Sequence, residues 1–178
     1  MKLTIKATLL AAAAALALSG PAQADTFVFS TILSKVGEPV PTSTATGASV
    51  VSFDDATDTV TVLLSFAGLA NSAPFGHIHC CTPTANTGSS GVALGFTPLP
   101  AATTGSYVNT FSLAPGAFDS LLTGTMAGKS YVNIHTPGTY AGGEIRGFLV
   151  PVPEPETYAL MLAGLGLLGW TARRRQRG

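Results

Sequence analysis

The segment GHIHCCT, residues 76–82, holds the side chains of this chain that are best suited to metal or redox chemistry. His77 and His79 are separated by one residue, and Cys80 and Cys81, which follow directly, are the only cysteines among 178 residues. Imidazole nitrogens and thiolate sulfurs are ligands that Cu and Zn prefer in proteins. A site for one of these ions is therefore one interpretation of the segment.

Strand geometry decides which side chains could join such a site. Side chains two apart on a strand point to the same face, so His77 and His79 should project together. His135 lies in a second predicted strand, and Glu144 and Arg146, again two apart, follow it after a turn. If these strands are neighbours, His135 and Glu144 would complete a Cu or Zn site with the first two histidines.

A buried polar network is the interpretation that we favour for the three histidines. In this network the imidazoles and a bidentate Glu144–Arg146 pair hold the strands in register without an ion. Acid–base catalysis is a third alternative. The network predicts no cofactor, whereas the metal-site alternative predicts Cu or Zn.

The elements that must position these residues are short β-strands. In the segment 58–66, Val60, Val62 and Leu64 alternate with the residues of the opposite face. FDDATDT, residues 53–59, has the turn chemistry of a hairpin connection, and 116–128 has the apolar spacing of one short helix. The sequence therefore predicts an all-β fold, an antiparallel β-sandwich or a barrel-like single domain with one short helix. The predicted strands lie within 26–33, 58–66, 106–113, 130–136 and 144–150.

The first 24 residues have the three parts of a secretory signal peptide. Lys2 and Lys6 form a basic start, the apolar run 7–18 follows, and Ala22-Gln23-Ala24 is a small-residue cleavage site. The apolar run is too short to span a bilayer comfortably. We expect removal of 1–24 and a mature domain that covers 25–150.

The last segment, 151–178, also has three parts. Pro153-Glu154-Pro155 is followed by the apolar run 158–172 and by arginines between 173 and 177. As a helix, the apolar run would cover ~22 Å, less than the ~30 Å hydrocarbon core of a bilayer. Flanking arginines can extend its reach and favour a cytoplasmic C-terminus.

This order of parts closely resembles the PEP-CTERM sorting signal of Gram-negative bacteria, with Pro153, Glu154 and Pro155 as the sorting motif. The resemblance implies a C-terminal hydrophobic sorting helix that acts as a transient transmembrane anchor in the inner membrane. It implies an exosortase-type protease as partner, release to the cell surface or extracellular space, and exopolysaccharide or other surface proteins as neighbours. A permanent C-terminal anchor is the alternative.

The adjacent cysteines should not remain free thiols in an exported protein, because that compartment is oxidising. Neighbouring Cα atoms across a trans peptide are only ~3.8 Å apart, below the usual disulfide range, so a bridge between Cys80 and Cys81 must close a strained ring. We nevertheless favour this vicinal disulfide. Thiolate ligation of a metal beside His79 and a bond to another chain are the alternatives.

Three motifs in the middle of the chain occur in a fixed order: GHIH at 76–79, YVNIHT at 131–136 and GGEIRGFL at 142–149. Together they resemble the CHRD domain, a module of the animal protein chordin and of bacterial secreted proteins, over residues 26–149. The resemblance implies no firm biochemical activity. Cys80-Cys81 departs from the usual pattern of these domains, so no role for that pair follows from it.

The net charge and the lack of known catalytic motifs narrow the expected classes of function. Residues 25–152 carry three basic and seven acidic side chains, a formal net charge of −4, which excludes a nucleic-acid-binding surface. We find no nucleophile elbow, phosphate loop, HExxH motif or paired catalytic carboxylates. We therefore expect an exported surface or matrix-associated protein that is structural or binding rather than enzymatic. A metal-binding or redox domain built on the histidines and cysteines is the alternative.

Overall fold

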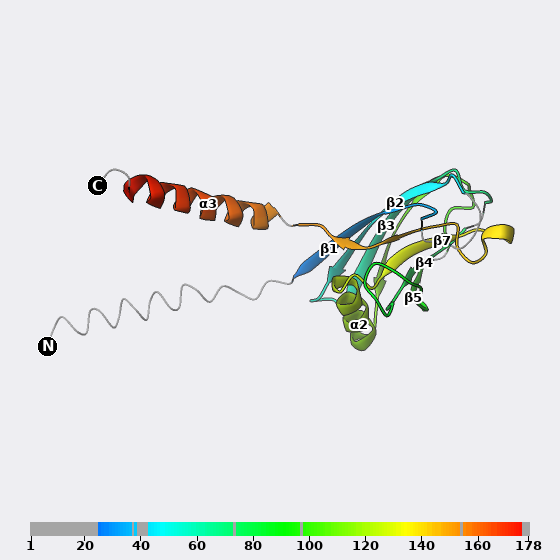
Figure 1. Cartoon of the computed structure of the whole chain (residues 1–178). Coiled ribbons are helices and arrows are strands. Elements are labelled where there is room, and N and C mark those ends of the chain that lie inside the picture. Colours follow the sequence, from blue (N-terminus) through cyan, green and yellow to red (C-terminus); the bar gives the residue numbers. More distant parts are fainter. Residues whose placement is uncertain are drawn as a thin grey trace.

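The computed structural model describes residues 25–36, 38, 43–72, 74–96, 98–153 and 155–175. Two antiparallel sheets pack as a β-sandwich, as expected (Figure 1). The predicted signal peptide, residues 1–24, lies outside the described residues. In chain order the elements are β1 (Thr26–Leu33), β2 (Thr46–Asp54), β3 (Thr59–Ala67), β4 (Phe75–His79), β5 (Val92–Phe96), β6 (Gly105–Ser112), α2 (Pro115–Met126), β7 (Tyr131–His135), the 3-10 helix η1 (Gly138–Tyr140), β8 (Ile145–Phe148), β9 (Val150–Pro151) and α3 (Pro155–Arg175).

The first sheet has the strand order β6-β3-β2-β1-β9, and the second has the order β5-β4-β7-β8. Neighbouring strands are antiparallel. Each segment predicted as a strand contains one, but β2 and β5 were missed. In β2 the inward positions include Ser49 beside Val51 and Phe53, so a polar residue interrupts the apolar alternation. β5 is only five residues long and includes Gly95, so its alternation is too short and too weak to mark a strand.

The hydrophobic core lies between the two sheets. Val60, Val62, Leu64 and Phe66 of β3 are all buried and point inward, as their spacing of two predicts. Ile78, on β4 of the facing sheet, is fully buried. Burying one such aliphatic side chain stabilises a fold by about 1.5–3 kcal/mol, so these rows fix which face of each sheet turns inward.

The segment FDDATDT forms the turn between β2 and β3, which confirms the predicted hairpin. The Oδ1 atom of Asp54 accepts hydrogen bonds from the backbone N–H groups of Ala56, at 3.0 Å, and Thr57, at 3.2 Å. Asp58 has a φ of 51°, a backbone conformation that Asp tolerates better than most residues. Local chemistry is therefore enough to turn the chain here.

The two sheets are joined along one edge, where the chain leaves β1. The Ser34 N–H donates to the Arg146 carbonyl at 3.1 Å, and the Arg146 N–H donates back to Ser34 at 2.8 Å. A Cβ atom at the adjacent Gly147 would overlap Thr31 Oγ1 and the Ile32 carbonyl, so glycine permits this close approach. The sandwich is thus partly closed, which accounts for the barrel-like character expected from the sequence.

The short helix α2 covers one end of the sandwich (Figure 1). Its Phe118 and Leu121 are buried, and the Phe118 ring packs edge-on against Phe53 with the centroids 5.8 Å apart. This confirms the predicted helix.

Among the described residues, no helix combines the length and the apolar character needed to cross a membrane.

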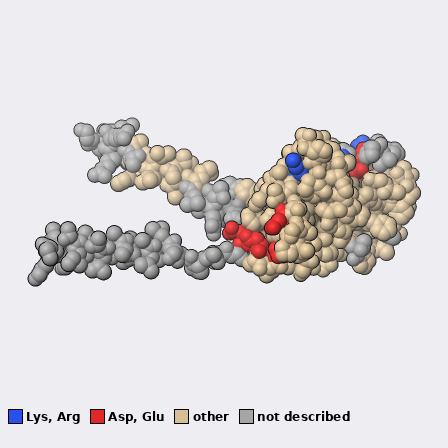
Figure 2. Space-filling model, turned by 90° about the horizontal axis from the view of Figure 1, so that it is seen from below, with Lys and Arg blue, Asp and Glu red and all other residues tan. Residues whose placement is uncertain are grey.

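Charged side chains are sparse on the face of the domain shown in Figure 2. Acidic side chains gather at the end where β1 begins and the β2–β3 hairpin turns. There the backbone N–H of Asp25 donates to Asp55 Oδ1 at 2.9 Å. The domain therefore has an acidic end, which is formed by the start of β1 and the β2–β3 hairpin.

Candidate metal centre

The three histidines lie together on the outer face of the second sheet. His77 and His79 lie on β4, on either side of the fully buried Ile78, so their side chains project away from the core. His135 ends β7, which pairs with β4. Pairing of the two strands brings together residues more than 50 positions apart in the sequence.

The imidazole rings form a compact group, which we call the three-histidine cluster (His77, His79 and His135). One nitrogen from each ring can be chosen so that all three lie within 4.8 Å of one another. The His77 and His135 ring centroids are 5.0 Å apart, and those of His77 and His79 are 5.6 Å apart. Among the described residues, no cysteine or carboxylate joins this group.

Backbone carbonyl groups set the proton positions on two of the rings. His79 Nδ1 is 2.9 Å from the Ser90 carbonyl oxygen, and His135 Nδ1 is 3.0 Å from the Ala141 carbonyl oxygen. Because a carbonyl oxygen only accepts, each Nδ1 must carry the hydrogen and donate it. In the neutral rings, the Nε2 atoms then hold lone pairs.

Those lone pairs are left without partners. His79 Nε2, His135 Nε2 and His77 Nδ1 are buried and have no hydrogen-bond partner within the described part of the chain. Ligating histidines in metal sites typically donate their other ring N–H to a carbonyl or carboxylate group, as two of these do. The arrangement is therefore that of three candidate ligands, two of which are oriented by carbonyl groups of the surrounding loops.

All three imidazoles are biased toward their neutral forms. Burial lowers the pKa of His77 to about 4, with further lowering by the neighbouring His135 and His79. Burial also lowers the pKa of His79 and that of His135, although the carbonyl groups of Ser90 and Ala141 act in the opposite direction. Neutral imidazole is the form that binds a metal ion.

We expect the metal-free protein to lose stability as the pH falls from about 6.5 toward about 4. The pKa values are lower in the folded state, so the unfolded chain binds more protons in this window and is favoured as the pH falls. Thermal unfolding at several pH values, with a chelator present, measures the effect. His77→Gln should have a shallower dependence. Equal slopes for the variant and the unsubstituted protein would contradict the assignment.

The sequence pattern predicts Glu144 as a candidate fourth metal ligand. In the structure, Glu144 lies instead in a separate hydrogen-bond network, outside the three-histidine cluster. The side chain is 1% exposed. Its Oε1 accepts from Ser43 Oγ at 2.7 Å and from the Ala70 N–H at 2.8 Å, and its Oε2 accepts from Thr136 Oγ1. Glu144 thus ties three loop segments together.

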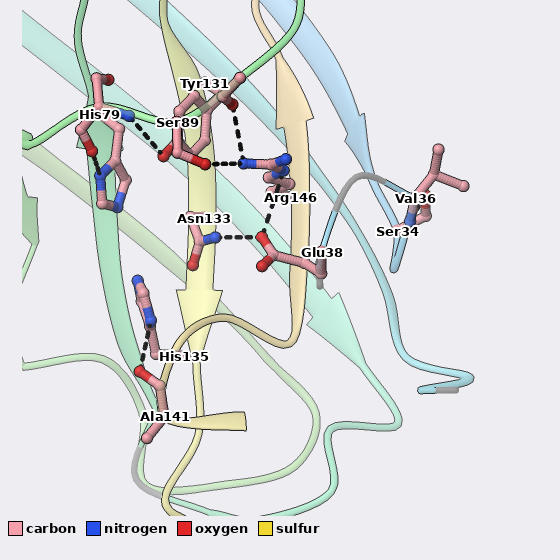
Figure 3. A network of polar contacts seen from close by, with 12 residues as sticks. Ser34, Val36, Glu38, His79, Ser89, Tyr131, Asn133, His135, Ala141 and Arg146 are labelled. Atoms are coloured by element: carbon pink, nitrogen blue, oxygen red, sulfur yellow. Dashed lines mark hydrogen bonds and ion pairs between the residues drawn. The ribbon is translucent and has the colours of Figure 1, made fainter. Parts of the chain in front are cut away.

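Arg146 pairs with Glu38 rather than with Glu144, so the predicted Glu144–Arg146 pair is replaced by two separate networks. Its Nε atom is 3.5 Å from Glu38 Oε1, and its NH1 atom donates to Gly88 and Ser89. Figure 3 shows this group beside the histidines.

The Arg146 guanidinium also lies over the Tyr131 ring, 4.9 Å from the centroid, and Tyr131 stacks on His79 at 4.7 Å. The cation is therefore coupled to the cluster through an aromatic ring. Tyr131 and Asn133 were missed by sequence reasoning, although the alternation in YVNIH, which places them on the face of His135, was a usable signal. Glu38 lies in a loop segment that carries no such pattern.

Cys80 and Cys81 are joined by a disulfide across a cis peptide bond, so both sulfur atoms are already bonded. They pack against α2, where a Cβ atom at Gly124 would overlap both of them. Cys81 Sγ is 3.8 Å from the Ser120 carbonyl oxygen. The disulfide therefore connects the end of β4 to the helix and directs no sulfur ligand to the three-histidine cluster.

Comparison with known families identifies two regions. The model of the CHRD domain family matches residues 29–149. The model of the PEP-CTERM protein-sorting motif matches residues 151–176. No curated protein and no solved structure matches the chain. The first match covers most of β1, all strands from β2 to β8, α2 and the whole three-histidine cluster, and the second covers α3.

Proposed function

This chain belongs to the CHRD domain family, and we propose that in this exosortase-sorted surface protein the domain binds one transition-metal ion. The ligands are His77, His79 and His135, and the ion is Cu or Zn, both of which imidazole nitrogens suit. The role is binding rather than catalysis. After sorting, the ion site is carried on a domain exposed to the cell exterior.

One observation carries this proposal: a nitrogen of each of the three imidazoles lies within 4.8 Å of the others, and each ring has a buried nitrogen without a hydrogen-bond partner within the described residues. A buried polar atom without a partner costs stability, and an ion satisfies all three at once. The polar network without an ion, which the sequence favours, would instead require hydrogen bonds from the rings to Glu144 and Arg146. Those two side chains have other partners.

The spacing suits a small ion after a slight closure. Zn–N bonds are about 2.0–2.1 Å and Zn sites are tetrahedral, so two nitrogens on one ion lie ~3.4 Å apart. The chosen nitrogens of the cluster lie within 4.8 Å of one another, so the widest pair must close by at most ~1.4 Å. Small side-chain rotations supply such a movement. The disulfide removes the thiolate alternative, because bonded sulfurs are not available as thiolate ligands.

We expect the exported protein, freed of metal by a chelator, to bind one Cu(II) or Zn(II) per chain. At a free-ion concentration of about 100 times Kd, the ion should stabilise the fold by about 2.7 kcal/mol. The melting temperature should rise by roughly 8–15 °C, as judged from the size of the domain. Isothermal titration calorimetry and thermal unfolding measure these effects.

The matched variants separate a built site from surface adsorption. His79→Gln should weaken binding by more than about 100-fold, since loss of an outer-shell partner alone often costs 10–100-fold. Asp119→Asn, which removes an exposed carboxylate on α2, should bind as the unsubstituted protein does. Unchanged affinity in His79→Gln, or no melting shift with either ion, would refute the proposal.

A further inference from the structure

We infer that the ion held by the three-histidine cluster keeps one exchangeable coordination position, and that Asn133 orients the small ligand bound there by accepting a hydrogen bond. The inference rests on the proposed metal-binding function and names the class of ligand that this site takes. That class consists of water and other small metal ligands whose coordinating atom carries a hydrogen atom.

The open position follows from the number of ligands. Zn is almost always bound by at least four ligands, and sites with three protein ligands take the fourth from water or substrate. Within the described residues the cluster offers three nitrogens and no carboxylate or thiol. His77 and His135 are only partly buried, so the cluster lies close to the surface of the domain.

Asn133 is placed beside this position by strand pairing. It is the direct partner of His77 across β4 and β7, and it lies two residues before His135 on the same face of β7. Its side chain therefore lies beside His77 and His135, and the residue is only 2% exposed. Figure 3 shows Asn133 beside His79 and His135, with its amide nitrogen toward Glu38 and its amide oxygen turned away from Glu38.

Glu38 fixes which way the amide of Asn133 points. Asn133 Nδ2 donates to Glu38 Oε1 at 2.5 Å, and the carboxylate that accepts this bond is itself paired with Arg146. The amide nitrogen must face the carboxylate, because a carboxylate accepts and does not donate. A Cβ atom at Gly143, which has a φ of 135°, would collide with both Glu38 and Asn133, so glycine permits this contact.

The consequence is a buried acceptor that points to the cluster and has no donor. Asn133 Oδ1 has no hydrogen-bond partner among the residues described. The Nε2 atoms of His79 and His135 hold lone pairs and cannot donate to it. A water molecule on the ion can donate, so one ligand fills the fourth position and satisfies the buried oxygen. Asn133 is thus a positioning residue rather than a ligand.

Azide tests this arrangement, because it binds copper and has no hydrogen to donate. The exported protein is loaded with Cu(II) and titrated with sodium azide, and the azide-to-copper charge-transfer absorption gives the affinity. Azide must displace the bound water, so removing the hydrogen bond to water should strengthen azide binding. Asn133→Leu should bind azide roughly 3- to 10-fold more tightly than the unsubstituted protein, as expected for one hydrogen bond.

Asn109→Leu is the matched control, since Asn109 is exposed on β6 of the other sheet, and its azide affinity should be unchanged. A second measurement needs no variant: Cu(II)-loaded protein should enhance the proton relaxation of bulk water, and azide should suppress the enhancement. Equal azide affinity in Asn133→Leu and the unsubstituted protein, or copper-loaded protein that neither relaxes water nor binds azide, overturns the inference alone. Failure to bind either Cu(II) or Zn(II) overturns the proposed function as well.

Discussion

Replacing Glu144 by leucine should lower the melting temperature by roughly 10–20 °C. The change removes a carboxylate that accepts from Ser43, Ala70 and Thr136, and leaves these donors facing an apolar side chain. Hydrogen bonds to charged groups contribute about 1.5–3 kcal/mol each, but relief of burying a charge offsets part of the loss. A net loss of about 3–5 kcal/mol remains, and thermal unfolding followed by circular dichroism measures it.

Glu144→Gln is the informative partner of that variant, because the amide keeps one acceptor oxygen and nearly the same volume. Its melting temperature should fall between those of the leucine variant and the unsubstituted protein. The metal affinity of Glu144→Gln should stay within about twofold of the original, because Glu144 is outside the three-histidine cluster. Loss of metal binding in this variant with little loss of stability would show instead that the carboxylate is a ligand.

Alanine in place of Pro153, Glu154 and Pro155 should abolish processing of the tail. These residues lie near the start of the region that matches the PEP-CTERM motif, residues 151–176, and shortly after β9. We expect the protein to accumulate with its C-terminal segment attached and in the membrane fraction. Intact-mass measurement and cell fractionation would detect the change. In the unsubstituted protein, the surface fraction should lack the tail.

The control for this experiment is the double variant Pro98→Ala and Pro100→Ala, which removes two prolines outside the sorting region. Its processing should be normal, because the sorting match begins at residue 151. Release of the Pro153-Glu154-Pro155 variant to the surface at the normal rate and length would contradict the assigned role of the motif.

Local sequence determined much of the fold and the direction of the histidines. Val60, Val62 and Leu64 alternate with a period of two, and only one face of such a strand can meet the core. The same rule places His77 and His79 on one face with Ile78 on the other. The turn at 54–59 depends on Asp54 bonding to backbone groups two and three residues later. Each of these features depends on residues close in sequence.

The tertiary structure alone decided which partners the polar side chains take. Glu38 reaches Asn133 across 95 residues, and Ser43 reaches Glu144 across 101. Spacing along a strand shows that Glu144 and Arg146 are two apart, but it does not show which loops will bring other donors and acceptors to them. The lone pairs of His79 and His135 are likewise directed by carbonyl groups of covering loops. Such contacts depend on strand order and loop path, because a hydrogen bond is made within ~3 Å in space whatever the separation along the chain.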